Sequence, residues 1–547
     1  TKRNNDLANE ILGKNIKVPY LNGGLFQKDK ADYCSFKLPK TQLDEMFKFF
    51  SAYNFTIDEN DPEDAEIGVD PEMLGRIFEN LLEDNKDKGA FYTPKEIVQY
   101  MCREALISYL QTGKAESDKT AIRSFVLTYN ATALRDDIKE DISEKLKNVK
   151  ICDPAIGSGA FPMGLLKELY ACRSSLEGIK DDNAAEIKKH IIQNNIYGVD
   201  IEKGAVDIAR LRFWLSIIVD EKTPHALPNM DFKIMQGNSL IPTFDGKFVN
   251  LADKLRHVHS SKIRDAKKKL SGLQQLFYDA VGEYKLELLI QIKYLILEIV
   301  KLQMDFEYKQ EVENNAESLN LFSQETAKEV KLDEEKRRIV GMCLKMQHDL
   351  SSASKSIEDK ASMELPFFDW KIMFPNVFNE QGFDIVIGNP PYFVYQESHV
   401  GEIADIRRDN DYKIAFGGKL NAYKLFLANA LEKLLKPDGI CSFIFQNSFL
   451  GDRQATILRK HVLENKTILN IDSFPERDSK KKRVFESVKM SVCIVLIQNT
   501  LSESSYRFNV DIWDDKYKSS GLNTNFPYDE ISQIDSVDYT IPRLRPE

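Results

Sequence analysis

Long hydrophobic runs are absent from this sequence. No apolar stretch in its 547 residues approaches the ~20 residues that a membrane-spanning helix needs. The first residues show no signal-peptide pattern. The composition, with 42% hydrophobic and 29% charged residues, is typical of a soluble globular protein. We therefore expect no membrane partner.

Paired cysteines and clustered histidines are absent as well. The seven histidines form no HxxxH or HExxH pattern. The seven cysteines are isolated, without a CxxC pair, at Cys34, Cys102, Cys152, Cys172, Cys343, Cys441 and Cys493. These absences argue against a zinc site and against a disulfide framework, and a reducing cytoplasm fits them.

An excess of positive charge is also lacking, since the formal net charge is −10. A protein covered in phosphate contacts would carry the opposite sign, yet a local basic groove stays compatible with this total because screening makes the relevant field local. One basic cluster, Lys480, Lys481, Lys482 and Arg483, stands directly before Phe485. Its two interpretations are a contact to DNA phosphates, which would position the protein, and a solvated loop.

Strand-like and helix-like segments alternate through most of the chain. The strand patterns lie at 149–153, 196–200, 232–236, 440–446, 468–474, 491–498 and 506–513. Helix-length segments separate most of them, and the one at 421–439 ends at a proline and a glycine. This alternation predicts an α/β fold with a doubly wound parallel sheet. After Tyr517 the sequence becomes polar and loop-like.

A charged, helix-favouring and glycine-poor block interrupts the alternation between residues 250 and 362. Apolar residues recur on one helical face of 286–303, which predicts a helical hairpin. It is interpreted as a scaffold or as a contact surface for nucleic acid or another domain. The predicted divisions are an N-terminal helical connector (1–86), the first part of the core (87–249), the helical insertion (250–362), the second part of the core (363–515) and a linker (516–547).

An acid, two glycines and a helix follow the first strand pattern, in "ICDPAIGSGAF". Asp153 ends the strand, and Gly157 and Gly159 form a turn whose backbone can approach a ligand closely. The helix that begins near Phe161 favours a negative group such as a carboxylate at its N-terminus. Pro162 replaces the third glycine of a dinucleotide fingerprint, which disfavours a pyrophosphate site. A tight turn without a ligand is the alternative.

Polar residues also end the next two strand patterns. Asp200 can accept two hydrogen bonds from a ribose diol, and Ile201 can lie against an adenine ring. Asn238 offers both a donor and an acceptor to an adenine edge. Each residue alone is as easily an ordinary strand-end polar group. Together they favour a ligand site, because ligands of open α/β sheets bind outside the strand ends.

The strand pattern at "DIVIGNPPY" ends in a second group of functional candidates. Asn389 Oδ1 and the Pro390 carbonyl can accept hydrogen bonds from the two N–H groups of an adenine N6 and so localise its lone pair. Pro390 and Pro391 add no N–H group that would repel the amine. Tyr392 can stack on a base that has been flipped out of the duplex. A strand that simply ends in prolines is the alternative.

These motifs resemble the gamma class of N6-adenine DNA methyltransferases, which use S-adenosylmethionine. "GAFYTPKEIVQYM" is similar to the segment that folds over the methionine end of the cofactor in that class. "DPAIGSGAF", "GVDIE", "QGNSL" and "NPPY" then follow in the gamma order. In "KRVFESVKMSV", Phe485 matches the aromatic residue that stacks on the second face of the flipped adenine.

The resemblance implies a Rossmann-like, S-adenosylmethionine-dependent methyltransferase sheet with an N-terminal helical region and a large helical insertion. Its implied catalytic residues are Asn389, Pro390, Pro391 and Tyr392. The implied cofactor-binding residues are Tyr92, Thr93, Pro94, Asp153, Pro154, Ala155, Gly157, Gly159, Phe161, Asp200, Ile201, Asn238, Ser239 and Asn389. The reaction would leave S-adenosylhomocysteine, with no general base assigned and no metal needed for methyl transfer.

"YLNGGLF", "VDPEMLGRIFENLL" and the helical insertion are similar to type IIG enzymes, which fuse restriction and modification in one chain. The expected partner is double-stranded DNA with a flipped adenine, in a bacterial cytoplasm. Two E-x-K patterns, "EYK" and "EVK", fall in the insertion and are interpreted as chance. No nuclease activity is therefore expected of this chain. Nuclease and target-recognition domains are expected in the same full-length protein.

Two other functions remain open from the residues. NPPY also suits the amide nitrogen of a protein glutamine, so a protein glutamine N-methyltransferase is one alternative. A non-catalytic, cofactor-binding module of a phage-defence complex is the other. Transfer of a labelled methyl group to DNA rather than to protein would separate these functions.

Overall fold

The structure is a computed structural model that describes residues 39–50, 92–178, 183–218, 220–221, 225–245, 247–249, 261–318, 326–486, 488–500 and 506–543. "YLNGGLF", "VDPEMLGRIFENLL" and the first residues of "GAFYTP" lie outside them. So does the predicted connector over 1–86, apart from Pro39 and helix α2 (Lys40–Phe50). The chain forms two compact units, residues 1–236, 381–399 and 411–547 in one, and residues 237–380 and 400–410 in the other.

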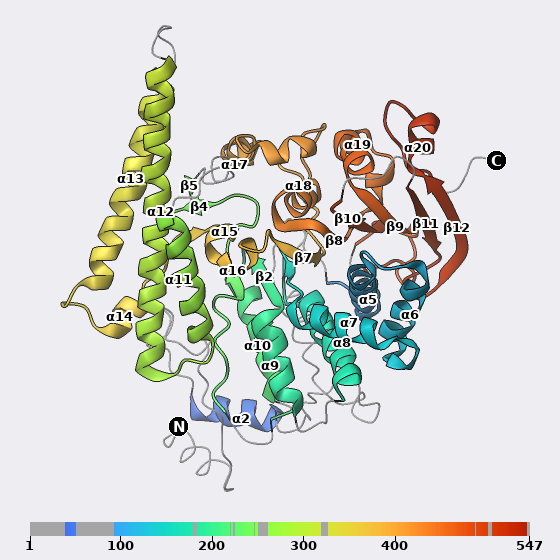
Figure 1. Cartoon of the computed structure of the whole chain (residues 1–547), viewed down its shortest axis with the longest axis horizontal. Helices are drawn as coiled ribbons and strands as arrows, with labels where there is room; N and C mark the ends of the chain where they lie inside the picture. Colours follow the sequence, from blue (N-terminus) through green and yellow to red (C-terminus); the bar gives the residue numbers. More distant parts are fainter. Residues whose placement is uncertain are drawn as a thin grey trace. The chain divides into compact units, whose positions relative to one another are not determined.

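Within the described residues, the first unit contains a nine-stranded sheet in the order β12-β11-β9-β10-β8-β7-β1-β2-β3 (Figure 1). The strands are β1 (Ile151–Asp153), β2 (Ile196–Asp200), β3 (Ile234–Gln236), β7 (Phe383–Gly388), β8 (Leu435–Gln446), β9 (Thr467–Phe474), β10 (Val492–Gln498), β11 (Arg507–Trp513) and β12 (Ser519–Pro527). The strands from β3 to β8 pair in parallel. The antiparallel strand β10 separates β8 from β9. From β3 to β9 this is the doubly wound 3-2-1-4-5-6 order with one strand inserted, and β11 and β12 extend the sheet beyond β9. The predicted α/β fold class is confirmed.

The helices of the first unit bury apolar residues that recur at helical spacing along one face. They are α5 (Lys95–Gln111), α6 (Glu116–Thr128), α7 (Asp136–Asn148), α8 (Ala160–Glu177), α9 (Ala184–Asn194), α10 (Lys203–Ile218), α18 (Ala422–Asn429), α19 (Thr456–Asn465) and α20 (Tyr528–Ile534). Helix α5 buries Val98, Met101 and Cys102. A Cβ added at Gly164 of α8 would lie 2.9 Å from both Val98 Cγ1 and Cys102 Sγ, so glycine is what permits this close helix contact.

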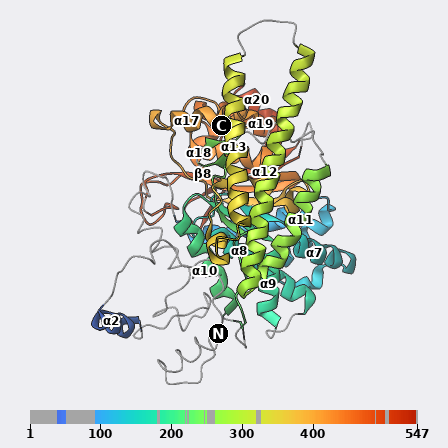
Figure 2. The same cartoon turned by 90° about the vertical axis from the view of Figure 1, so that its left-hand side faces the viewer.

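The second unit contains the helical insertion. Its helices are α11 (Ser261–Tyr278), α12 (Gly282–Ser318), α13 (Thr326–Ser351), α14 (Ile357–Ser362), α15 (Trp370–Met373), α16 (Pro375–Phe378) and α17 (Val400–Ile406). Figure 2 shows α12 and α13 as two long rods side by side. Ile292, Ile296 and Val300 of α12 are buried, as are Ile339 and Cys343 of α13. The segment 286–303 predicted as an apolar-faced helix therefore lies within α12.

A small sheet accompanies these helices. Among the described residues of the second unit, β4 (Thr243–Phe244) pairs with β5 (Lys247–Phe248) and with β6 (Phe367–Phe368). The compact unit thus starts at Gly237, earlier than the predicted insertion boundary at 250. No helix in the described part of either unit is long and apolar enough to cross a bilayer.

Two predicted elements are wrong. The helix predicted over 421–439 ends earlier, because α18 passes into one π-helical turn (Ala430–Leu434) and β8 begins at Leu435. Pro437 and Gly439, which were predicted to end the helix, instead belong to a bulge within β8. Leu435 pairs with Phe383, and the next paired residue is Ile440. Asp438 takes the left-handed conformation there (φ 62°).

The prediction that the chain becomes loop-like after Tyr517 is also wrong. β12 pairs antiparallel with β11 along its length, and α20 follows, so the predicted linker over 516–547 begins with a strand of the sheet. Along β12, Thr524 and Phe526 are buried and most other side chains face solvent. A strand at a sheet edge needs few apolar residues, which is why the polar sequence concealed it.

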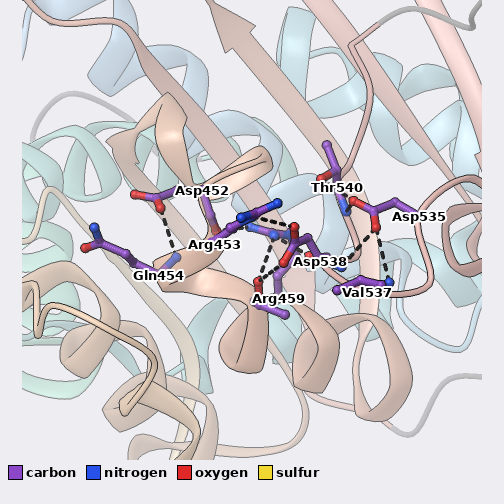
Figure 3. Close-up of polar contacts among 9 residues, drawn as sticks. Asp452, Arg453, Gln454, Arg459, Asp535, Val537, Asp538 and Thr540 are labelled. Atoms are coloured by element: carbon purple, nitrogen blue, oxygen red, sulfur yellow. Dashed lines mark hydrogen bonds and ion pairs between the residues drawn. The ribbon is translucent and has the colours of Figure 1, made fainter.

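The segment after α20 is held to the body of the first unit by Arg459 of α19 (Figure 3). Arg459 is fully buried, and its guanidinium donates to the carbonyl oxygens of Tyr539 (2.7 Å), Phe449 (2.6 Å) and Asp538. Asp535 closes the segment on itself by accepting the Thr540 hydroxyl (2.7 Å). A planar group with five donors is well suited to such a set of carbonyl acceptors.

Replacing Arg459 with methionine is expected to lower the free energy of unfolding by about 3 kcal/mol, because several buried carbonyl groups lose their donors. It should also expose residues 535–543 to protease. Urea unfolding and limited proteolysis measure both effects. The matched control is Arg453→Met, since Arg453 is 86% exposed and pairs with Asp538 of the same segment. An Arg459 variant no less stable than the Arg453 variant would contradict this view of the anchor.

Asp472 of β9 is a buried carboxyl that no sequence pattern indicated. It accepts hydrogen bonds from Tyr100 Oη (3.0 Å) and Trp513 Nε1 (2.9 Å). Burial raises the pKa of this carboxyl from 3.8 to about 7, against the lowering effect of these two donors. Because the folded pKa is the higher one, the folded state binds the proton more tightly than the unfolded state. The associated stability is complete below pH 4 and is lost as pH rises toward 7.

Asp472→Asn should therefore be more stable than the parent protein at neutral pH, by on the order of 4 kcal/mol as an upper figure. The difference should shrink toward pH 4 and vanish below it, where the parent carboxyl becomes protonated in the unfolded state as well. Urea unfolding of both proteins between pH 4 and pH 8 measures it. A stability difference that is flat with pH would show that this carboxyl does not titrate in the window.

Candidate active site

The turn between β1 and α8 forms a cradle of backbone groups. Gly157 and Gly159 both take left-handed conformations (φ 52° and 86°), which a larger residue adopts with strain. A Cβ at Gly159 would also lie 3.2 Å from Ala209 Cβ. Helix α8 starts directly afterwards at Ala160. Its first N–H groups, which have no acceptor within the helix, therefore face the turn. The turn can therefore hold a ligand close to its backbone.

Asp153 lies at the base of this cradle. It is 1% exposed, and its Oδ1 accepts the Ala155 N–H at 3.0 Å. Burial raises the pKa of this carboxyl well above its ordinary range, and the nearby Asp200 adds to the effect. An acid with a raised pKa at a strand end is a frequent property of functional sites. A cationic ligand group beside Asp153 would favour its charged form.

Asp200 connects the cradle to β2. Its Oδ2 accepts the Gly157 N–H (2.9 Å) and its Oδ1 accepts the Glu202 N–H (2.9 Å). Burial raises the pKa of Asp200, which these backbone donors oppose. Each oxygen keeps a second lone pair that can accept from a ligand hydroxyl. The contact of Asp200 with a ribose stays a prediction. The structure shows that Asp200 also holds the glycine turn in place.

The second motif lies at the neighbouring strand end. β1 and β7 pair in parallel, with Cys152 opposite Val386. A Cβ at Gly388, the last residue of β7, would lie 2.7 Å from Asp153 Oδ1. Strand order reverses between β1 and β7, and such switch points are where open α/β sheets bind ligands. The cradle and Asn389 therefore open at the same edge of the sheet.

The Asn389 side chain is held by two hydroxyl groups. Its Nδ2 donates to Thr93 Oγ1 at 3.1 Å, and its Oδ1 accepts from the Tyr392 hydroxyl. Tyr392 also lies 2.9 Å from the Ile444 carbonyl oxygen, and its side chain is buried. Burial raises the pKa of Tyr392, so the ring stays a neutral phenol that can donate. The amide acceptor predicted to receive an amine is thus already paired within the protein.

The rings of Tyr392 and Phe485, predicted to stack on the two faces of a base, lie close together and are not parallel. Their ring centroids are 6.1 Å apart and their planes meet at 62°. A base stacked between two rings needs them parallel and about 7 Å apart, twice the contact distance of carbon atoms. Phe485 is 1% exposed. Stacking on both faces of a base therefore requires one ring to turn, and this role stays a prediction.

The basic cluster is divided by the structure. Lys480, Lys481 and Lys482 are exposed. Arg483 is half-buried, and its guanidinium donates to the carbonyl oxygens of Glu486 and, at 3.4 Å, Arg477. Arg483 therefore helps to shape the loop, whereas the three lysines present their charges to solvent.

Four further predicted residues have surroundings of other kinds. Phe161 is buried at the start of α8, whereas Ile201 is 63% exposed. Asn238 and Ser239 belong to the second unit, just beyond the end of β3. There Asn238 Oδ1 accepts the Leu240 N–H at 2.9 Å. The contacts predicted for these residues with a cofactor stay predictions.

A pocket next to the cradle includes residues that the sequence did not indicate. It is open to solvent and is lined by Tyr92, Thr93, Lys95, Val98, Gln99, Ala160, Met163, Gly164, Lys167, Glu168 and Arg212. Arg212 of α10 is buried and donates to the Ser158 carbonyl oxygen at 2.9 Å, in the middle of the cradle turn. Glu168 pairs with Arg103 at 3.1 Å. Tyr92 and Thr93 of this lining were predicted, whereas no local pattern marks Arg212 and Glu168, because α5, α8 and α10 meet only in the folded chain.

These features fit S-adenosylmethionine. The glycine turn exposes backbone without a Cβ, Asp200 carries carboxylate oxygens that could accept from a ribose, and the pocket extends from Thr93 along α8. Its lining combines apolar and charged side chains, which suits a cofactor with a methylene chain, a sulfonium and a zwitterionic end. The residues present therefore match the group that the sequence motifs implied.

Comparison with known proteins gives the same assignment. The family model described as Eco57I restriction-modification methylase matches residues 194–480, more than half of the chain. The MmeI DNA-methyltransferase domain model matches residues 130–241.

Two curated relatives support the match. A Methanocaldococcus jannaschii protein named as a type II restriction enzyme and methyltransferase is 26% identical over 533 residues, covering 88% of this chain and 42% of that protein. The modification methylase CviBIII of Paramecium bursaria Chlorella virus NC1A is 30% identical over 132 residues, covering 24% of this chain and 30% of that protein. The chain spans less than half the length of these relatives.

Solved structures with some likeness include the type IIL restriction-modification enzyme MmeI in complex with DNA. It is 13% identical with a TM-score of 0.40, covering 84% of this chain and 43% of that one. The type IIG restriction endonuclease BpuSI is 11% identical with a TM-score of 0.36, covering 86% and 34%. The family assignment rests on the sequence model, whose match includes β2, β7 and the NPPY motif. This chain belongs to the Eco57I restriction-modification methylases.

Proposed function

We propose that this chain transfers a methyl group from S-adenosylmethionine to the N6 of adenine in DNA, as the modification part of a restriction-modification protein. The single observation that carries the proposal is the closeness of the two strand ends that precede these motifs, since β1 and β7 pair in parallel and a Cβ at Gly388 would lie 2.7 Å from Asp153 Oδ1. A donor site and an amine site must adjoin for direct transfer, because orientation of the two reactants supplies much of the rate. Family membership supports the same chemistry.

The first half of the sheet would hold the cofactor. The glycine turn and Asp153 lie at the end of β1, and Asp200 lies at the end of β2. The pocket from Thr93 along α8 suits the amino-acid end of the molecule. When bound, the cofactor supplies an electrophilic methyl group on a sulfonium and leaves as S-adenosylhomocysteine. We assign no metal to this step.

The second half would hold the amine. Asn389 Oδ1 and the Pro390 carbonyl oxygen would accept hydrogen bonds from the two N–H groups of N6. These bonds would localise the nitrogen lone pair that attacks the methyl carbon. Tyr392 and Phe485 hold the flipped base flat by stacking. The proton that N6 loses after transfer passes to water. Thr93 already holds Asn389 Nδ2, so the reorganisation needed is release of Oδ1 by the Tyr392 hydroxyl and a turn of one stacking ring.

DNA would be held near this site by exposed cations. Lys480, Lys481 and Lys482 lie on the loop that carries Phe485, so a base stacked on Phe485 brings its phosphates toward them. Contacts of this kind position the DNA without reading its sequence. We further propose that target recognition and cleavage belong to other parts of a longer protein.

Changing the three lysines together to glutamine is expected to weaken DNA binding about tenfold or more at 50–100 mM salt, with a shallower salt dependence. Fluorescence anisotropy with labelled duplex DNA at several salt concentrations measures both quantities. The matched control changes Lys460, which lies on α19, to glutamine. If DNA affinity depended equally on salt concentration in the parent and the triple variant, these lysines would not contact DNA phosphates.

The decisive experiment supplies labelled S-adenosylmethionine, a pool of duplex DNA and a cell protein extract. N6-methyladenine in the digested DNA supports the proposal. Label on protein glutamine instead of DNA would assign the enzyme to protein methylation. Binding of the cofactor with no methyl transfer to either acceptor would indicate a non-catalytic module. The full-length protein is the second sample, because DNA affinity of this chain alone can limit the signal.

A further inference from the structure

Thr93 and Asn389 are 296 residues apart in sequence and in contact in the structure. Thr93 lies two residues before α5 and is 4% exposed, and its Oγ1 accepts the Asn389 Nδ2–H at 3.1 Å. The same threonine lines the pocket beside the cradle. Its hydroxyl therefore stands between the two halves of the site.

We propose that Thr93 is a positioning residue for the Asn389 amide. Its hydroxyl holds Nδ2 so that Oδ1 is directed at the target amine. The inference rests on the proposed methyl transfer and adds to it a role for Thr93 other than contact with the cofactor.

The amide needs such a partner because its two ends have nearly the same shape and opposite hydrogen-bonding character. Only Oδ1 accepts, while Nδ2 carries two donors. The terminal torsion of asparagine is broad, so packing alone does not choose between the two orientations. A flipped amide would point N–H groups at the N–H groups of adenine. A fixed acceptor for Nδ2, such as Thr93 Oγ1, opposes that flip.

Tyr392 can release the Asn389 acceptor because its hydroxyl carries one proton and lies near two acceptors. These are Asn389 Oδ1 and the Ile444 carbonyl oxygen, the latter at 2.9 Å. When an amine approaches Oδ1, the tyrosine can keep its hydrogen bond by donating to Ile444 alone. Freeing the acceptor then leaves no buried hydroxyl unpaired, which would otherwise cost about 1–3 kcal/mol. Throughout this exchange Thr93 still holds Nδ2.

The Thr93 hydroxyl also has a proton of its own to donate. Because Thr93 lines the pocket, an acceptor bound there can receive that proton while Oγ1 accepts from Asn389. Chains of hydrogen bonds of this kind polarise one another. The segment before α5 would then act on the amide as well as on the cofactor.

The test compares Thr93→Val, which keeps the shape and removes the hydroxyl, with Thr93→Ser, which keeps the hydroxyl. Methylation of duplex DNA is measured under steady-state conditions with saturating substrates. We expect T93V to lower kcat roughly 10- to 100-fold, as misplacement of a reacting group does, with KM for S-adenosylmethionine changed less than about threefold. T93S should recover kcat to within about threefold of the parent.

The matched control is Thr112→Val at the other end of α5, whose hydroxyl donates to the Ser108 carbonyl oxygen at 2.9 Å. It should leave both constants unchanged. Thermal unfolding of every variant checks that it folds, and Thr93→Ala replaces T93V if the valine is not accommodated.

Three results would overturn the inference. A raised KM for S-adenosylmethionine with kcat intact would make Thr93 a cofactor contact only. A T93S variant as slow as T93V would assign the effect to packing of the methyl group. A parent protein that binds the cofactor and never methylates DNA would remove the proposed function and this inference with it.

Discussion

Asn389→Ala is expected to abolish measurable methyl transfer to DNA while cofactor affinity stays within a few-fold of the parent. The variant removes the proposed side-chain acceptor for the N6 amine and leaves the cradle at Gly157 and Gly159 unchanged. Loss of one preorganised polar group of this kind typically costs about 100- to 1,000-fold in rate. Removal of the partner of Thr93 and Tyr392 adds to the loss. Radiolabel transfer and calorimetric titration with S-adenosylhomocysteine measure the two effects separately.

The matched control for this variant is Asn525→Ala on the edge strand β12, where the side chain contacts Asn509 and Arg507. It should methylate DNA at the parent rate. If Asn389→Ala retained more than about a tenth of the parent kcat, an acceptor role for the amide would be untenable.

Gly388→Ala is expected to impair both folding and catalysis. The added Cβ would lie 2.7 Å from Asp153 Oδ1, inside a buried parallel pair of strands where neither backbone can shift freely. Overpacking of this kind costs about 1–3 kcal/mol of unfolding free energy. Because Asp153 supports the cradle and Asn389 follows Gly388 directly, both halves of the site should be displaced, lowering kcat/KM about 100-fold. Urea unfolding and steady-state methylation measure the two quantities.

Gly272→Ala is the control for this second variant. Gly272 lies inside α11, and among the described residues its added Cβ would meet nothing within 4 Å. Alanine should stabilise that helix by about 0.5–1 kcal/mol and leave methylation unchanged. A Gly388 variant as stable and as active as the parent would mean that the two strand ends are not in close contact in solution.

The motifs that carry chemistry were predictable because their residues are close in sequence. Gly157 and Gly159 mark a turn that needs left-handed backbone, and the structure has both in that conformation. Asp153 and Asn389 follow buried strand patterns, so the local sequence is enough to place them at strand ends. Parallel strands end at one edge of a sheet, which was enough to expect a shared site.

The predictions that proved wrong concern segments whose local sequence pattern disagrees with their tertiary contacts. The proline and glycine after α18 are ordinary helix-stop residues, yet pairing of Leu435 with Phe383 makes them part of a strand bulge. β12 looks polar because only one of its edges is paired and little of it is buried. Arg459 resembles any helical arginine in the sequence. Its importance comes from carbonyl groups up to 80 residues away in sequence that the fold brings to it.

The sequence by itself determined the family and the α/β class, and it predicted residues for a methyl donor and an amine, since motifs and the alternation of strands and helices can be read from neighbouring side chains. Only the tertiary structure decided which residues hold these groups in place. The contact of Thr93 with Asn389, the hydrogen bond from Arg212 to the cradle turn and the closeness of Gly388 to Asp153 join distant parts of the chain. Local periodicity carries no information about such pairs, because strand order and helix packing are set by burial of the whole core.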